Sequence, residues 1–264
     1  MEHAQLPREP ATAYKTRVAR ETQPVVYGLR AVLAVHAHRP EAIERVWYSR
    51  DAQTGLQDFF RDLARRRVPY REAKDDELER VAGAIHHEGL VARARARKPP
   101  SLEALADRMV EERGFGLALD RVQNPHNLGA IVRSAAFFGA TAVVLGGGGQ
   151  ARLGAAAVRI AEGGAELVEI VETSSLASAL ATLRSKGVRV IGTDAKAERD
   201  LRDLGRGGAR LDRPCVVVMG NEREGLARDV RKQCDLLIAI RGAGTLDSLN
   251  VSVAAGVVLS ALAG

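Results

Sequence analysis

The 264-residue chain contains few of the residues that build disulfide frameworks, metal sites and aromatic binding platforms. It has two cysteines, and aromatic residues make up 4% of it. Cys215 and Cys234 show neither CxxC nor metal-ligand spacing, so we expect reduced packing residues, no metal and a cytoplasmic location. With so few aromatic side chains, stacking on exposed bases is expected to be a minor binding mode and phosphate contacts the larger one.

Two further patterns are absent. The sequence has no GxGxxG fingerprint, and the run Gly146 to Gly149 is better explained as a flexible loop, which argues against a nucleotide-dependent enzyme. No apolar run of membrane-spanning length precedes the C-terminal segment, and that segment, rich in Gly, Ala and Ser, is too short to cross a bilayer. We therefore expect no membrane partner.

Positive charge is what the chain has in excess. Its 39 Lys and Arg residues exceed its 33 Asp and Glu residues, which gives a net charge of +6 and a pI near 9.7. This excess favours a polyanion such as nucleic acid as partner. The alternative is an arginine-rich proteome, which would raise the arginine content in the same way. Two clusters could grip RNA phosphates, or could equally be solvated, charge-protected edges. They are Arg65, Arg66 and Arg67 at a predicted helix end, and Arg93, Arg95 and Arg97, which alternate with alanines and would project to one side of a strand.

The proline pair at 99–100 divides the chain. We expect a disordered basic arm at 1–23, an α/β domain at 24–98, a linker at 99–113 and a second α/β domain at 114–264. Hydrophobic periodicity predicts the elements of both domains. In the first they are helices over 25–38, 56–67 and 75–83 and strands over 43–49, 68–73 and 89–98; in the second, helices over 125–138, 151–166 and 174–186 and strands over 143–145, 167–171, 188–193 and 215–219.

Three segments of the second domain place polar residues at the edge of an apolar element. Ser248 and Asn250 are good N-cap residues for an apolar C-terminal helix that we expect to be buried, and its N-terminus could hold a polar or anionic group. Gly220 and Glu222 follow a continuous β-branched strand, where ligands bind in open α/β sheets. Arg133 lies within a helix. The alternative interpretations are a capped core helix and a snorkelling surface arginine.

Together and in this order, the segments resemble the SpoU (TrmH-like) family of RNA ribose 2′-O-methyltransferases. Asn127 and Arg133 match the first motif of this family, and two later segments match its second and third motifs. The resemblance implies methyl transfer from S-adenosylmethionine to a ribose 2′-hydroxyl of rRNA or tRNA. It also implies an α/β fold whose mostly parallel sheet forms a deep trefoil knot, an L30e-like substrate-binding domain, and a homodimer formed through the C-terminal domain. The second motif is Gly220-Asn221-Glu222 with Gly225-Leu226, and the third is Ile240 with Ser248-Leu249-Asn250.

The resemblance also assigns roles. A ribose hydroxyl is a weak nucleophile, so the site must activate it and hold it in line with the methyl group. Arg133 either stabilises the developing alkoxide electrostatically, which physical grounds favour, or gives up a proton; the family assigns it activation of the hydroxyl. Glu222 would hold a neighbouring group, such as Arg133. The catalytic set is Asn127, Arg133, Glu222, Ser248 and Asn250, and the cofactor set is Thr193, Gly220, Asn221, Gly225, Ile240, Leu249 and Asn250.

The chain departs from the family pattern at two places. His87-Glu88-Gly89 stands where the family often has His-Gln-Gly, and Ile240-Arg241 where it often has Ile-Pro. The first puts an acid near an RNA surface, and the second loosens the cofactor loop or adds an RNA contact. The alternative functions are a noncatalytic RNA-binding or assembly protein that retains the fold, and a nucleotide-dependent enzyme.

Overall fold

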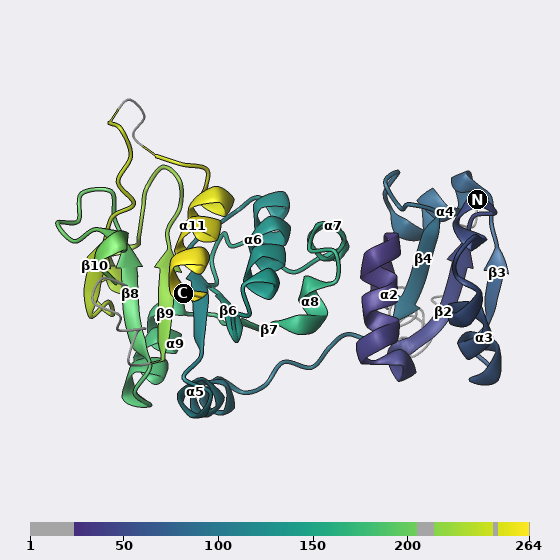
Figure 1. Ribbon diagram of the computed structural model, residues 1–264, viewed down its shortest axis with the longest axis horizontal. Coiled ribbons are helices and arrows are strands. Elements are labelled where there is room, and N and C mark those ends of the chain that lie inside the picture. Colours follow the sequence, from purple (N-terminus) through teal and green to yellow (C-terminus); the bar gives the residue numbers. More distant parts are fainter. Residues whose placement is uncertain (1–23, 205–213, 245–247, 264) are drawn as a thin grey trace, which may run out of the picture. The chain divides into compact units, whose positions relative to one another are not determined.

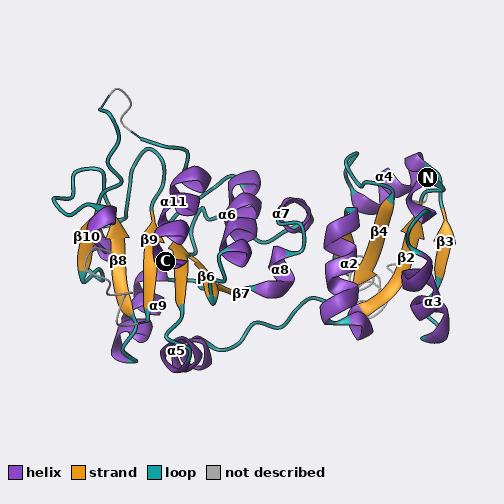
Figure 2. Cartoon of the chain, in the orientation of Figure 1, coloured by secondary structure: helices purple, strands orange, loops and turns teal. Residues whose placement is uncertain are grey.

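The computed structural model describes residues 24–204, 214–244 and 248–263. The predicted basic arm at 1–23 lies outside these residues. The contacts within the chain define two compact units: residues 24–29 and 39–97 belong to the first, and residues 30–38 and 98–264 belong to the second. Each unit has its own sheet (Figure 1, Figure 2).

The first sheet has four strands in the order β1-β4-β2-β3. Strands β2 and β3 are parallel, while β4 is antiparallel to both β1 and β2. The predicted helix over 25–38 is wrong in its first turn, because Val25, Val26 and Tyr27 pair with β4, and Gly28, with φ of 96°, separates this strand from the helix. The elements are β1 (Val25–Tyr27), α2 (Leu29–His38), η1 (Pro40–Ala42), β2 (Ile43–Tyr48), η2 (Asp51–Gln53), α3 (Gln57–Arg65), β3 (Tyr70–Glu72), α4 (Asp75–Ala82) and β4 (Leu90–Ala94).

Aromatic side chains join the first sheet to helix α3. The Phe60 ring lies 4.5 Å from that of Tyr48 on β2, measured between centroids, and Phe59 and Leu63 are buried beside it. Helix α4 begins with three carboxylates in its first turn, where they complement the helix dipole, and it ends at Gly83 in the left-handed conformation. These two helices therefore form where the amphipathic pattern predicts them.

Residues 102–111 correct the predicted linker at 99–113. They form helix α5 (Leu102–Glu111), which begins at Ser101, whose Oγ accepts a hydrogen bond from the Ala104 amide at 3.2 Å. Leu105, Ala106 and Met109 recur at helical spacing and are fully buried in the second unit's core. The proline pair therefore marks the end of one unit and the start of the next, and only a short connection lies between them.

The second sheet is wholly parallel and has the strand order β10-β8-β9-β5-β6-β7. As predicted, β9 is covered on both faces, and every one of its residues is buried. Strands β5 and β10 are not among the predicted elements. The strands are β5 (Phe115–Leu119), β6 (Ala142–Leu145), β7 (Glu169–Glu172), β8 (Arg189–Thr193), β9 (Cys215–Met219) and β10 (Leu236–Ile238).

Helices cover both faces of this sheet. Leu117 and Leu119 of β5 point to a core shared with α6, α7 and α11, whereas Ala118 between them points to a core shared with α5, α9 and α10. The single helix predicted over 151–166 is broken at Glu162 and Gly163, both of which have positive φ. The helices are α6 (Pro125–Phe137), α7 (Ala155–Ile160), α8 (Gly164–Leu167), α9 (Leu176–Ser185), η3 (Leu201–Leu204), α10 (Arg228–Arg231) and α11 (Val251–Ala263).

Helix α11 is buried along one side only, which corrects the expectation of a fully buried C-terminal helix. Val251, Ala255 and Val258 lie in the core, but Val253 is 53% exposed and Val257 39% exposed. A helix that is apolar on all sides has the same sequence pattern whether or not one of its faces is exposed. None of the helices in the described ranges is long and apolar enough to cross a membrane.

Both cysteines are free thiols, as predicted. Burial raises the pKa of Cys215 to about 12 and that of Cys234 to about 11. Neither side chain is therefore a reactive thiolate at neutral pH. Within the described residues no group of three or more His, Cys, Asp or Glu side chains could hold a metal ion.

Candidate functional site

Side chains from all three motifs meet at one place in the second unit. Asn127 Nδ2 donates to Glu222 Oε1 at 2.7 Å, and Asn250 Nδ2 donates to Asn127 Oδ1 at 3.3 Å. Asn127 belongs to α6, Glu222 follows β9, and Asn250 precedes α11, whose neighbour α6 lies beside it in Figure 1. We call these three residues the polar cluster. It fixes which way the Asn127 amide faces, because its NH₂ and its oxygen each have a partner.

Asn250 has a second function, which is to begin helix α11. Its Oδ1 accepts hydrogen bonds from the Ser252 amide at 2.9 Å and from Ser252 Oγ at 2.6 Å. Residues of this type were expected at the start of the helix, and the structure places Asn250 there. Ser248 and Leu249 are exposed next to it, and Leu249 is 46% accessible.

Arg133 does not join the polar cluster. Its Nη1 forms an ion pair with Glu162 Oε1 at 2.8 Å, and its side chain is 55% exposed. The suggested pairing of Glu222 with Arg133 is therefore not seen, and Glu222 holds Asn127 instead. Arg133 follows Asn127 by six residues on α6, which is about 9 Å along the helix axis. The Arg133 guanidinium is therefore separate from the polar cluster, although Arg133 and Asn127 share helix α6.

The second motif forms a closed loop after β9. The amides of Asn221 and Gly225 each donate to the other residue's carbonyl, at 3.2 and 2.9 Å, and Asn221 Oδ1 accepts from the amides of Arg223 and Glu224. Gly220 lies so close to this loop that a Cβ added to it would come within 2.5 Å of the Gly225 carbonyl carbon. A side chain at position 220 would therefore displace the loop.

Asp120 and Arg121, which sequence reasoning missed, hold this loop from the end of β5. Buried Asp120 accepts a hydrogen bond from the Ala227 amide at 2.6 Å, and Arg121 bonds Glu224 and the Gly225 carbonyl, the latter at 3.0 Å. Arg121 has φ of 59°, an unusual conformation for a residue with a side chain, which these contacts offset. The acid directly after an apolar strand was the signal that could have revealed Asp120.

The other predicted cofactor residues lie at neighbouring strand ends. Thr193 ends β8 and donates from Oγ1 to the Val218 carbonyl at 2.9 Å; Ile240 follows β10 and packs against the core. Because β10, β8 and β9 are adjacent and parallel, Thr193, Gly220 and Ile240 lie at the carboxyl ends of three neighbouring strands. Backbone groups beside apolar side chains suit an adenine ring, and backbone carbonyls suit a positively charged sulfur, so these strand ends fit S-adenosylmethionine.

Arg241 holds the loop that follows β8. Its Nη2 donates to the carbonyls of Ala197 and Glu198 at 2.9 and 3.1 Å, and its Nε lies 3.9 Å from Asp200. Arg241, which stands where the family often has proline, therefore makes hydrogen bonds within the protein to the loop after β8. At the other end of this loop, a hydrogen bond from Arg231 lowers the pKa of Asp194.

Hydrogen bonds from Arg202 lower the pKa of Asp200 from 3.8 to about 2. A carboxylate whose pKa is lower in the folded state stabilises that state at pH above 3.8, and the contribution is lost as pH falls towards 2. Asp200→Asn is therefore expected to lower the Tm by about 1–3 °C at pH 7. The deficit should shrink below pH 4, as measured by thermal unfolding at several pH values. A deficit that is the same at pH 3 and pH 7 would contradict this.

Most of the arginines predicted to bind RNA have partners within the first unit. Arg65 and Arg66 both pair with Asp62 at the end of α3, and Arg67 follows in a left-handed conformation. Strand β4 ends at Ala94, so only Arg93 of the alternating set lies within it; Arg95 donates to the Glu41 carbonyl at 2.6 Å, and Arg97 is also engaged.

Glu88 replaces the expected glutamine for a local reason. Its Oε2 accepts a hydrogen bond from the Leu29 amide, at the N-terminus of α2, at 3.0 Å. A carboxylate is favourable at the positive end of a helix. The acid therefore contributes to the first unit's own structure.

Comparison with known proteins agrees with this geometry. Residues 114–260 match the model of the SpoU rRNA Methylase family, and residues 25–100 match that of the RNA 2′-O ribose methyltransferase substrate-binding domain. A 23S rRNA (guanosine-2′-O-)-methyltransferase, RlmB, from Pseudomonas putida is 35% identical over 89% of this chain and 93% of its own length. The RlmB of a Burkholderia species is 38% identical over 89% and 94%.

Solved structures share the fold. The SpoU methyltransferase AviRb from Streptomyces viridochromogenes has a TM-score of 0.75 at 24% identity, covering 94% of this chain and 91% of its own. An AdoMet-bound rRNA methyltransferase from Sinorhizobium meliloti has a TM-score of 0.74 at 24% identity, covering 94% and 89%.

The two matching family models, an rRNA methylase over residues 114–260 and an RNA 2′-O ribose methyltransferase substrate-binding domain over residues 25–100, identify an RNA ribose methyltransferase. The chain belongs to the SpoU rRNA methylase family. It is an enzyme that uses S-adenosylmethionine to methylate ribose 2′-hydroxyls, as the motifs predict.

Proposed function

We propose that this enzyme methylates the 2′-hydroxyl of a guanosine in 23S rRNA, in the cytoplasm, and that residues 24–98 bind the RNA while 114–264 carry out the transfer. The observation that carries the catalytic part is the polar cluster, which brings together Asn127, Glu222 and Asn250 from three motifs. A noncatalytic RNA-binding protein would have no need of this arrangement. The curated RlmB relatives favour 23S rRNA over tRNA as substrate.

The chemistry assigns a task to each residue. When bound, S-adenosylmethionine supplies a methyl group on a positively charged sulfur. The sulfur leaves as a neutral thioether, so its departure needs neither an acid nor a metal. Asn127, held by Glu222 and Asn250, positions the ribose or an adjacent phosphate through neutral hydrogen bonds. Arg133 stabilises the negative charge that develops on the attacking oxygen as the hydroxyl proton passes to solvent.

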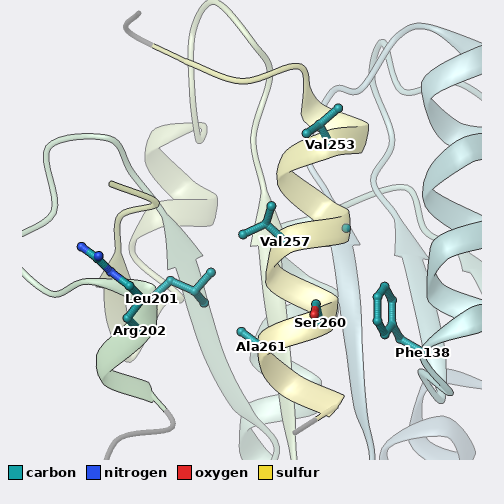
Figure 3. Close-up of a pocket in the computed structure, with 8 residues that line it drawn as sticks. Phe138, Leu201, Arg202, Val253, Val257, Ser260 and Ala261 are labelled. Carbon is teal, nitrogen blue, oxygen red and sulfur yellow. The ribbon is translucent and has the colours of Figure 1, made fainter. Parts of the chain in front are cut away.

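We propose that the enzyme is a homodimer that forms through α11. An apolar groove runs along its exposed side (Figure 3) and supports this, because a second copy of the same helix could fill it. Small side chains at Gly256, Ser260 and Ala261 would allow close packing. The separation of Arg133 from the polar cluster also fits a site that a neighbouring subunit completes. The groove is lined by Phe138, Leu201, Arg202, Val253, Gly256, Val257, Ser260 and Ala261.

Val257→Glu is expected to convert the dimer to a monomer and to lower methyl transfer, because the new carboxylate would be buried at the interface without a partner. Light scattering coupled to size-exclusion chromatography measures the mass. Val110→Glu is the matched control, since Val110 is similarly exposed but lies on α5, outside the groove. A dimer that survives Val257→Glu would rule out this interface.

We also infer a trefoil knot. Strand β10 lies at the sheet edge, while α11 packs on β5 and β9 near its centre, so the chain must return across the sheet. The Leu201 amide donates to the Ala239 carbonyl at 2.8 Å, and η3 packs against α11. These contacts join the described part of the β8–β9 connection to the end of β10 and to α11, which supports the knot. A crystal structure that traces this connection tests the inference.

Mapping of ribose methylation in cellular RNA tests the proposed substrate. Cells without the gene should lack one 2′-O-methylguanosine in 23S rRNA, and a plasmid copy should restore it. A plasmid copy carrying Arg133→Ala should not. Loss of a tRNA mark, with 23S rRNA unchanged, would replace the proposed substrate by tRNA.

A further inference from the structure

Two arginines on neighbouring strands of the first unit lie against the same tryptophan. Arg45 of β2 and Arg93 of β4 are directly opposite each other in the antiparallel ladder. The guanidinium carbons lie 5.7 and 5.8 Å from the centroid of the Trp47 ring, within the range of a cation–π interaction. The ring therefore holds two positive charges close together in defined positions.

Neither guanidinium of this pair has a carboxylate partner among the residues that the structure describes. Arg93 Nε is buried there and makes no hydrogen bond. Like charges directly opposite each other in a ladder are destabilising, so the pair has an electrostatic cost that an anion would remove. Six other arginines of this unit differ, because each has an acidic partner: Arg50 with Glu72, Arg61 with Asp58, Arg65 and Arg66 with Asp62, Arg71 with Glu77, and Arg80 with Asp76.

We propose that Arg45 and Arg93 together bind one phosphate of the substrate RNA, with Trp47 orienting both guanidiniums. Arginine binds phosphate through paired hydrogen bonds from its planar fork, and stacking on an aromatic ring presets that fork. The matched RNA substrate-binding domain makes RNA the anion of choice. The inference rests on the proposed function for its ligand. It pairs Arg93 with Arg45 on the neighbouring strand, whereas the sequence pattern grouped Arg93 with Arg95 and Arg97.

The salt dependence of RNA binding tests this site. The probe is an unmodified 23S rRNA transcript, bound by the full-length protein in filter assays from 50 to 300 mM KCl. A plot of log K for RNA binding against log salt concentration has a negative slope, and loss of one phosphate contact reduces the magnitude of that slope by about 1. Arg45→Gln/Arg93→Gln is expected to show this drop and a raised KM for RNA, with kcat and S-adenosylmethionine affinity unchanged.

Arg61→Gln/Arg80→Gln is the matched control, because it removes the same charge from two exposed arginines that already have acidic partners. Its slope should equal that of the wild type. Equal slopes for all three proteins, or equal drops for both double variants, would overturn the phosphate site. The single variant Arg45→Gln, at an exposed position, should show the same drop and covers the case in which the double variant fails to fold.

The same experiment separates this inference from the proposed function. If the wild-type protein binds the transcript without methylating it, and the slopes still differ as expected, the substrate assignment fails and the phosphate site stands. If methylation is normal and the slopes are equal, the phosphate site fails and the substrate assignment stands.

Discussion

Arg133→Ala is expected to lower kcat for methylation of 23S rRNA by about 10²–10³-fold, the usual cost of removing one group that stabilises developing charge. Affinity for S-adenosylmethionine should not change, because the predicted cofactor residues lie in other loops. Calorimetry measures the binding, and transfer of labelled methyl groups under saturating RNA measures kcat. Folding should be intact, since the Arg133 side chain is 55% exposed.

Arg152→Ala provides the control for loss of a paired surface arginine, because Arg152 pairs with Glu172 in the same unit. Its kcat should match that of the wild type. Arg133→Lys, which keeps a charge, should retain more activity than Arg133→Ala if the role is electrostatic. A kcat for Arg133→Ala within a factor of about two of the wild-type value would remove Arg133 from the mechanism.

Gly220→Ala is expected to weaken S-adenosylmethionine binding by about 10–100-fold. The added Cβ would lie 2.5 Å from the Gly225 carbonyl carbon and 2.8 Å from the Leu226 nitrogen, and backbone atoms cannot rotate away as a side chain can. Overpacking of this kind costs about 1–3 kcal/mol, and each 1.4 kcal/mol is tenfold in affinity. Isothermal titration calorimetry measures the change.

Gly154→Ala is the matched control, because it makes the same substitution before α7, outside the predicted cofactor residues, where the added Cβ would meet nothing within 4 Å. It should bind the cofactor as the wild type does. Equal affinities for Gly220→Ala and Gly154→Ala would show that the shape of the loop after β9 does not matter for the cofactor.

The parallel sheet could be predicted in part, because β9 is a continuous apolar run, but its neighbour β5 at the centre of the sheet was missed. The errors have local physical causes. The three-residue strand β1 continues into α2 without a change in apolar pattern, so only Gly28 marks the boundary. Helix α5 lies directly after the proline pair and reads as linker until its burial is known. For α11, periodicity cannot distinguish a helix covered by its own chain from one with an open face.

For the candidate site, the sequence predicted which residues take part better than it predicted which side chains they contact. Asn127, Glu222 and Asn250 were expected in one site because the family resemblance assigns all three to it, and the hydrogen bonds among them agree with that. The ion pair of Arg133 with Glu162 depends on how α6 packs beside the turn after α7, which sequence spacing does not determine. The role of Arg121 depends on a positive φ, which is unusual for arginine and gives no sequence signal.

The chemical position of the transferred methyl group tests the central claim most directly. Purified enzyme, methyl-labelled S-adenosylmethionine and an unmodified 23S rRNA transcript are incubated together, and the RNA is then hydrolysed in alkali. A 2′-O-methyl group blocks cleavage at its own nucleotide, so the label should appear in an alkali-stable dinucleotide that contains guanosine. Label in mononucleotides, which would place the methyl group on a base, or no label at all, would contradict the account.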